Sequence, residues 1–329
     1  MTSIYITEAG AKLQHKGGRV VIGRNQEVLM EVPIEKVEDV SLVDSVQISS
    51  SLLTELLARG VPITWLSGQG KYFGTLINTD TVDIFKQLKQ FELLTSDNFY
   101  FALSKKIIRA KVNNQLVVLR RYSRNCEDGL IDLQIKNIYS LRRRINTSAN
   151  RDELRGYEGF VSRVYFEALG KLVPEEFCFN KRSRRPPLDP FNAMLSLGYS
   201  MLFNEVMAAI VSSGLHPFVG FMHSLAKGHP ALASDLMEEW RAPVVDTLVL
   251  SMVRKHMLDV SYFQNNNGCY LTVEGRKIFL EAYNKKLRSE NQYLDSKLSY
   301  RESIGKQVKK YVTAMVHEDV ELYSPLNLE

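Results

Sequence analysis

The protein has 329 residues, of which 45% are hydrophobic and 24% are charged, a composition typical of a globular protein and not of a fibrous or disordered one. The length favours two domains. No apolar run reaches the roughly 18 residues that span a bilayer, and no secretory signal pattern is visible near Met1. Three widely spaced cysteines suit neither a disulfide framework nor a zinc site. We therefore expect a cytoplasmic protein without a membrane segment.

The basic residues are concentrated in one part of the chain. The net charge is +5, yet residues 1–95 carry 9 Lys/Arg against 11 Asp/Glu, whereas residues 105–186 carry 19 Lys/Arg against 9 Asp/Glu. Such a concentration indicates a polyanionic partner. A solvated basic face without any ligand would have the same composition, so charge alone leaves both interpretations open.

The first eighty residues are predicted to form a small β-rich domain. Alternating apolar and polar residues between turn signals predict strands, and these strands cover residues 3–7, 19–22, 27–33, 37–43 and 62–66. Residues 49–59 have apolar side chains at helical spacing and a serine-rich start that can cap a helix. The glycine-rich residues 68–74 match no phosphate-binding fingerprint and predict a hairpin turn.

From about residue 80 the apolar residues recur with the period of an α-helix. Residues 81–95 are predicted as a linker with a first helix, and residues 104–122 as a strongly amphipathic basic helix. Further helices are predicted at residues 130–145, 150–170, 190–213, 231–241, 243–258 and 272–290, with a Pro- and Arg-rich loop at 181–190. The predicted fold class is α+β, with a small N-terminal β-rich domain at residues 1–80 and a larger all-α domain at residues 96–329.

Three segments of the helical region carry side chains suited to metal or acid–base chemistry. Glu158 lies between glycines in Gly-Tyr-Glu-Gly (156–159), where small neighbours let a ligand approach. His223 ends Gly-Phe-Met-His (220–223), and Asp235 and Glu238 are three residues apart and can share a helical face. Each has an ordinary structural explanation: an acid in the first turn of a helix, a core histidine, or a solvated acidic stretch paired with Arg241.

Taken together, the three segments resemble the signature blocks of the CRISPR-associated spacer-acquisition integrase family. Similar blocks occur in the predicted β domain at residues 5–11, 37–40, 60–63 and 70–74, and in the helical domain at residues 111–119, 185–192 and 271–276. The blocks follow the correct order from about residue 3 to residue 290, which makes the resemblance specific.

The resemblance implies a divalent metal site made by Glu158, His223 and Glu238, with Asp235 supporting the site from the same helix or accepting a hydrogen bond from the histidine. A mixed carboxylate and imidazole site suits Mg²⁺ or Mn²⁺. The implied reaction is a phosphodiester transesterification, in which the 3′-hydroxyl of a DNA fragment attacks a phosphate at the border of a CRISPR repeat. Asp189 and Asn192 fall in a matching block and are candidates for a supporting role.

The implied partners are duplex DNA fragments with 3′-OH ends, CRISPR repeat DNA, a second copy of the chain bound through the β domain, and a small CRISPR-associated adaptation protein. Charge alone suggests contacts with the DNA backbone from Arg120, Arg121, Arg182, Arg184, Arg185 and Lys227. Two other functions stay open: a structure-specific, metal-dependent endonuclease acting on branched DNA, and a nucleic-acid-binding module without catalysis.

Overall fold

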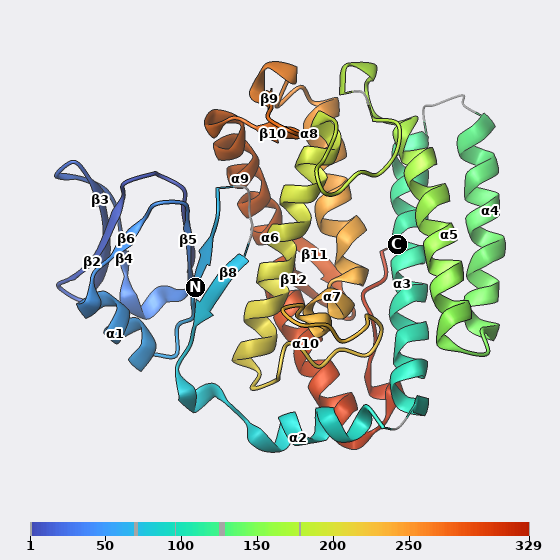
Figure 1. Ribbon diagram of the computed structural model, residues 1–329, viewed down its shortest axis with the longest axis horizontal. Coiled ribbons are helices and arrows are strands. Elements are labelled where there is room, and N and C mark those ends of the chain that lie inside the picture. The colour runs from blue at the N-terminus through green and yellow to red at the C-terminus, as the bar shows by residue number, and fades with distance from the viewer. Residues whose placement is uncertain (1, 69–71, 96, 125–128, 178, 329) are drawn as a thin grey trace. The chain divides into compact units, whose positions relative to one another are not determined.

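The structure is a computed structural model that describes residues 2–68, 72–95, 97–124, 129–177 and 179–328. The chain forms two compact units, and we describe each by itself (Figure 1). The first unit comprises Met1–Ile84 with Val211–Leu215, and the second comprises Phe85–Ile210 with His216–Glu329. The division predicted from the sequence, with residues 81–95 as a linker, stays a prediction.

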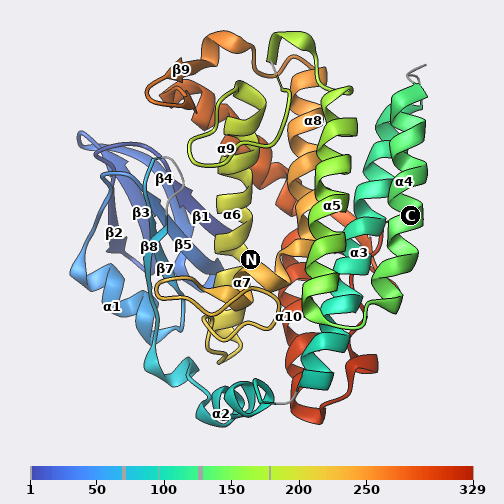
Figure 2. The same cartoon turned by 45° about the vertical axis from the view of Figure 1, so that its right-hand side comes forward.

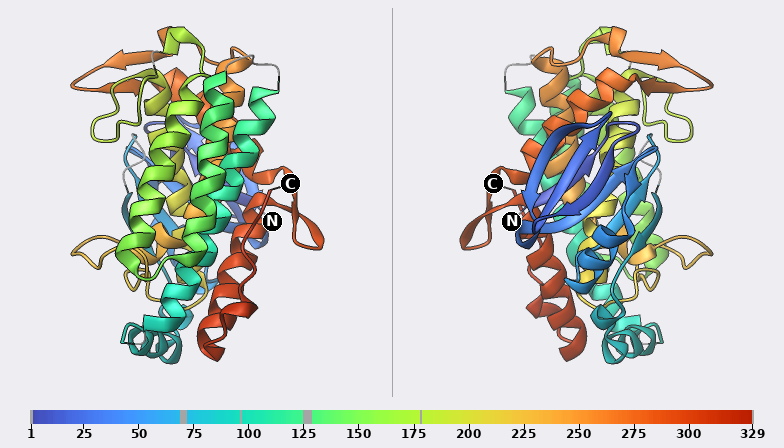
Figure 3. Two further views of the ribbon diagram at one scale, coloured as in Figure 1. Left: turned by 90° about the vertical axis from the view of Figure 1, so that its right-hand side faces the viewer. Right: turned by 90° about the vertical axis from the view of Figure 1, so that its left-hand side faces the viewer.

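The first unit contains two four-stranded sheets, whose strands are seen in the right-hand view of Figure 3. One sheet has the order β1 (Thr2–Ile6), β5 (Val37–Val43), β7 (Ile63–Leu66) and β8 (Tyr72–Leu76), and the other has the order β4 (Glu27–Pro33), β3 (Arg19–Arg24), β2 (Lys12–Lys16) and β6 (Gln47–Ile48). β1, β5 and β7 are parallel, whereas β7 and β8 are antiparallel. The predicted turn at 68–74 joins these last two strands, but residues 69–71 lie outside the described chain.

The core of this unit is aliphatic and includes Leu13, Val40, Leu52 and Ile63, all fully buried. Leu52 belongs to the single α-helix described before residue 80, α1 (Ser50–Ala58), whose first turn is capped as predicted because the Ser49 hydroxyl accepts a hydrogen bond from the Leu52 N–H. The sequence did not predict β2, in which Leu13 is the one fully buried residue between polar neighbours.

The rest of the chain is mostly helical. The α-helices are α2 (Ile84–Leu93), α3 (Asp97–Ser123), α4 (Gly129–Thr147), α5 (Arg151–Gly170), α6 (Pro190–Ser212), α7 (Ala231–Leu236), α8 (Thr247–Arg254), α9 (Val273–Arg288) and α10 (Tyr300–His317). Two hairpins accompany them, β9 (Phe263–Asn265) with β10 (Cys269–Leu271), and β11 (Glu290–Tyr293) with β12 (Ser296–Ser299). The α+β fold class is confirmed, although the helical region carries these hairpins and α10, which the sequence analysis did not include.

Helices α3, α4 and α5 pack side by side, as Figures 2 and 3 show. α6 is long and apolar enough to cross a membrane by length and composition, but 61% of its most apolar stretch is buried inside the protein, as in a core helix. Such a helix is weak support for a membrane segment.

The predicted helices at 231–241 and 243–258 differ most from the structure. α7 ends at Leu236 and is followed by a 3-10 turn (Glu238–Trp240) and a π-helical turn (Arg241–Asp246) before α8 begins at Thr247. Pro243 cannot donate a backbone hydrogen bond, which favours an irregular turn at this point. Single π turns inside helices are frequent at functional sites, and this one follows the 3-10 turn that carries Glu238.

Candidate active site

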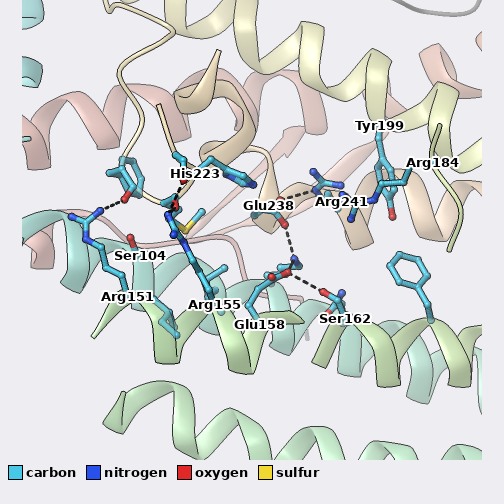
Figure 4. Close-up of a pocket in the computed structure, with 18 of the residues that line it drawn as sticks. Ser104, Arg151, Arg155, Glu158, Ser162, Arg184, Tyr199, His223, Glu238 and Arg241 are labelled. Atoms are coloured by element: carbon cyan, nitrogen blue, oxygen red, sulfur yellow. Dashed lines mark hydrogen bonds and ion pairs between the residues drawn. The ribbon is translucent and has the colours of Figure 1, made fainter. Parts of the chain in front are cut away.

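A cavity of about 300 Å³ lies in the helical unit and is lined by all three predicted metal ligands (Figure 4). Glu158 comes from α5, His223 from the segment between α6 and α7, and Glu238 from the 3-10 turn after α7. Asp235 does not line the cavity but lies directly behind His223 in α7. The fold therefore brings together side chains that are far apart in the sequence.

The two carboxylates meet through a lysine of α3. The Lys111 ammonium forms ion pairs with Oε1 of Glu158 and with Oε2 of Glu238, the latter at 2.7 Å. The side chains of Lys111 and Glu238 are 8% and 6% exposed, whereas that of Glu158 is 30% exposed and opens to the cavity. The hydroxyl of Ser162, one helical turn along α5, donates to Glu158 at 2.9 Å.

Glu238 has a second cationic partner, because the Nε atom of Arg241 lies 3.0 Å from its Oε1. The sequence had suggested this pair as part of a solvated stretch, but both side chains are largely buried. Burial alone would raise the pKa of Glu238, yet the charges of Arg241 and Lys111 outweigh it and lower that pKa to about 2. Glu238 is therefore ionised at neutral pH.

Glu158 and Lys111 follow the same pattern. Burial opposes the charge on Glu158, but the nearby ammonium of Lys111 dominates and lowers the pKa of the carboxyl. Burial likewise opposes the charge on Lys111, and the two carboxylates more than offset it, so the lysine pKa is raised. Glu158, Glu238 and Lys111 are therefore all charged at neutral pH.

His223 is held by Asp235, a fully buried carboxylate. Nδ1 of the imidazole lies 2.6 Å from Oδ1 of Asp235, and this hydrogen bond raises the histidine pKa against the opposing effect of burial. Nδ1 carries the proton in this arrangement, so Nε2 is the nitrogen left for a ligand. Asp235 thus accepts the hydrogen bond that the sequence analysis proposed as one of its two roles.

The segment before His223 is folded around the same carboxylate. The backbone N–H groups of Phe221 and Met222 donate to Oδ2 of Asp235 at 2.6 and 2.9 Å, and the N–H of His223 donates to Oδ1 at 3.0 Å. A Cβ at Gly220 would lie 2.7 Å from Oδ2 of Asp235, so this glycine is required by the close approach of the carboxylate.

Two arginines of α5 hold this segment from the other side. Arg151 donates to the carbonyl oxygen of Phe221, and Arg155 donates to that of Met222 at 2.8 Å. Both arginines line the cavity (Figure 4). α5 therefore supplies Glu158 and also fixes the backbone that carries His223.

Within the described residues, no group of three or more His, Cys, Asp or Glu side chains is arranged to hold a metal ion. The donor set nevertheless fits a cation. The Oε2 atom of Glu238 is buried and is contacted by the Lys111 ammonium at 2.7 Å, and a carboxylate oxygen with two lone pairs can accept a further ligand. Ionised carboxylates and a neutral imidazole nitrogen are ligands that Mn²⁺ and Mg²⁺ accept.

The six predicted DNA contacts fall into two groups. Arg184 is exposed and lines the cavity, and exposed side chains are also found at Arg120, Arg121, Arg185 and Lys227. Arg182 differs, because its guanidinium donates to Oδ1 of Asn192 at 2.8 Å and to the hydroxyl of Ser196 at 3.1 Å.

Asp189 and Asn192 bond to each other at the start of α6 and do not line the cavity. Together with the contacts of Arg182, they tie down the loop at residues 181–190. Their expected support of the metal site stays a prediction. The structure shows them hydrogen-bonded to each other at the end of this loop.

Lys111, Arg151 and Arg155 were not among the site residues predicted from the sequence. Lys111 lay in a block that matched the family, and its spacing from Ile107, Asn114 and Val118 places it on the buried side of the helix. A charged residue on an apolar helix face signals a buried ionic partner, and that signal could have identified it.

Comparison with known proteins identifies the family of the chain. Residues 4–285 match the family described as CRISPR associated protein Cas1. A CRISPR-associated endonuclease Cas1 of Thermus thermophilus is 33% identical over 320 residues, which cover 96% of this chain and 94% of that protein.

Two solved structures share the fold. One is a casposase bound to integration product, with a TM-score of 0.82 and 20% identity over 100% of this chain and 96% of that chain. The other is a Cas6-RT-Cas1–Cas2 complex, with a TM-score of 0.86 and 21% identity over 100% of this chain and 36% of that chain. From the family match and the curated relative, we conclude that the chain belongs to the CRISPR-associated Cas1 family.

Proposed function

We propose that the protein is a metal-dependent DNA integrase that joins the 3′-OH ends of short DNA fragments to phosphates of a CRISPR repeat array by transesterification. The observation that carries the proposal is the convergence of Glu158, His223 and Glu238 on one cavity. These side chains come from three separate elements of the chain. Binding of one shared cation would account for their common position, which supports the proposal.

In this proposal, Glu158, Glu238 and Nε2 of His223 hold Mg²⁺ or Mn²⁺. The bound cation would lower the pKa of the attacking hydroxyl and offset the negative charge that builds up on the phosphate. Asp235 keeps His223 in the tautomer that presents Nε2. The exposed Arg184, together with Arg155, supplies positive charge at the cavity for the DNA backbone.

The proposed substrates are duplex fragments with 3′-OH ends and CRISPR repeat DNA, and the proposed location is the cytoplasm. The casposase neighbour is bound to an integration product, and the other neighbour is part of a complex with Cas2. These likenesses support DNA as the ligand and a small adaptation protein as the partner. We further propose a homodimer formed through the β-rich unit, whose sequence is slightly acidic and therefore a poor surface for DNA.

A second candidate function is metal-dependent cleavage of branched DNA. The Thermus thermophilus relative is named an endonuclease, and hydrolysis would use water in place of a 3′-hydroxyl at the same site. A non-catalytic nucleic-acid-binding module is the third candidate, because the basic residues alone would serve it.

A strand-transfer assay separates the three. Labelled duplex fragments with either 3′-OH or 3′-dideoxy ends are incubated with protein, a repeat-bearing plasmid and Mn²⁺. The integrase proposal predicts labelled plasmid only with 3′-OH ends, and none after chelation of the metal. Plasmid cleavage without labelling would favour the nuclease. Retention of DNA with no reaction, whether or not the partner protein is added, would favour the binding module.

A further inference from the structure

Lys111 occupies an unusual position for a lysine. Its ammonium lies between the two carboxylates proposed as metal ligands, paired with Glu158 on one side and at 2.7 Å from Glu238 on the other. Its side chain is 8% exposed and lines the same cavity. Figure 4 shows the side chains of Glu158 and Glu238 pointing toward one another across the cavity. A positive charge therefore already stands where a cation that bridges both carboxylates would stand.

The charges of the cluster are balanced without any metal. Glu158 and Glu238 contribute two negative charges, and Lys111 and Arg241 contribute two positive charges. A divalent cation added to this set would leave two uncompensated positive charges in a largely buried site, which is costly. If the lysine ammonium left the carboxylates, one of these two positive charges would leave the site. The oxygen atoms that the cation needs would then be free.

Arg241 is not the cation that would leave the two carboxylates. It contacts Oε1 of Glu238 but forms no ion pair with Glu158 among the described residues, whereas Lys111 pairs with both acids. The four-carbon stem of lysine carries a compact charge that reorients easily, whereas the planar guanidinium of Arg241 lies over the Tyr199 ring and pairs with Glu238. Lys111 is thus the exchangeable cation of the pair.

We propose that Lys111 is an internal counter-ion that holds Glu158 and Glu238 together in the metal-free protein, and that a divalent cation binds by displacing it. This inference rests on the proposed function, since the cation is the one that the integrase reaction uses. Lys111 acts here as a positioning residue for the two acids.

The first test measures Mn²⁺ binding to the full-length protein by electron paramagnetic resonance, without DNA. We expect Lys111→Met to bind Mn²⁺ about tenfold more tightly than the wild type, because no ammonium has to leave first. Without metal, Lys111→Met should have a lower melting temperature than the wild type, because the two carboxylates lose their shared partner. Adding Mn²⁺ should raise the melting temperature of Lys111→Met more than that of the wild type. Lys105→Met on the same helix is the matched control, because Lys105 lies over the Phe101 ring and does not line the cavity. Its Mn²⁺ affinity should match that of the wild type.

The second test uses the wild-type chain, so it does not depend on the folding of a variant. Amine acylation followed by mass spectrometry reports the accessibility of each lysine. We expect Lys111 to be protected without metal and to react several times faster in saturating Mg²⁺, while Lys227 keeps a constant rate.

The role of Lys111 and the metal site itself can fail separately. The counter-ion role would be overturned if Lys111→Met bound Mn²⁺ no more tightly than the wild type and if metal did not change the acylation of Lys111 in the wild type. The metal site would still stand if Glu158→Gln abolished Mn²⁺ binding. Absence of any Mn²⁺ binding that depends on Glu158 would instead remove the metal site of the proposed function.

Discussion

The Nδ1 atom of His223 lies 2.6 Å from Oδ1 of Asp235, and the same carboxylate accepts the backbone N–H groups of residues 221–223. One buried acid therefore sets the path of the loop, the orientation of the imidazole and its tautomer. Asp235 lies in α7, one turn before the 3-10 segment that carries Glu238. The position of the histidine and that of the second carboxylate are thus fixed by the same short stretch of chain.

Replacement of Asp235 by Asn is expected to lower the pKa of His223, because the hydrogen bond to Asp235 is the main cause of its raised value. A raised folded-state pKa means that this interaction stabilises the protein fully below pH 6.5, and that the contribution is lost as the pH rises through the folded-state pKa. NMR titration of the metal-free protein measures the change. His216, whose pKa is lowered by burial, serves as the internal reference, and an unchanged His223 titration would contradict the assignment.

Gly220→Ala and Gly159→Ala are expected to have opposite effects on stability. A Cβ at Gly220 would lie 2.6 Å from Ala231 and 2.7 Å from Asp235, so alanine there should cost about 1–3 kcal/mol through overpacking. Gly159 lies inside α5 with nothing within 4 Å of its Cβ position, so alanine should stabilise the helix by about 0.5–1 kcal/mol. Urea denaturation measures both, and a stable Gly220→Ala variant with normal strand joining would refute the need for close approach.

Arg182 and Arg184 are two residues apart but should respond differently to substitution. Arg182→Ala removes hydrogen bonds to Asn192 and Ser196 and is expected to lower the unfolding free energy by about 1–3 kcal/mol. Arg184→Ala should leave the melting temperature unchanged and weaken DNA binding, because that side chain is exposed at the cavity. Equal loss of stability in both variants would show that Arg184 is also structural.

DNA binding is expected to weaken steeply with salt, because each phosphate neutralised by an arginine releases counterions. Combined replacement of Arg120, Arg121, Arg184 and Arg185 by alanine should flatten the slope of log K against log salt by about one unit per lost phosphate contact. Fluorescence anisotropy with a labelled duplex gives the slope. An unchanged slope would place the DNA surface elsewhere on the protein.

Much of the helical framework could be predicted because local signals and the apolar period agree. The helix predicted at 150–170 is α5, which begins after the Asn150 cap and ends at Gly170, and the helix predicted at 190–213 is α6. α10 was not predicted, although the serine and glutamate at positions 299 and 302 form the capping box that starts it.

The irregular turns after α7 could not be read from periodicity, because Leu236, Trp240 and Val244 continue a helical apolar pattern through them. These turns also make tertiary contacts that periodicity does not report, such as the ion pair of Glu238 with Lys111 of α3. The ligand set itself came from the family resemblance, and the counter-ion became visible only when α3 and α5 were brought together.

In the proposed function, Glu158, His223 and Glu238 form the centre that joins DNA strands. Single-turnover strand transfer by Glu158→Gln and His223→Ala tests it most directly, with Glu167→Gln on the exposed face of α5 as the matched control. We expect the rate to fall by about a thousandfold or more in both variants, because phosphate charge at the transition state is poorly compensated. Duplex affinity should stay within a few-fold of the wild type, and the melting temperature should be close to that of the wild type. Glu167→Gln should be fully active. Wild-type joining by Glu158→Gln would contradict the claim, and so would a joint loss of DNA binding and melting temperature, which would make Glu158 a structural residue.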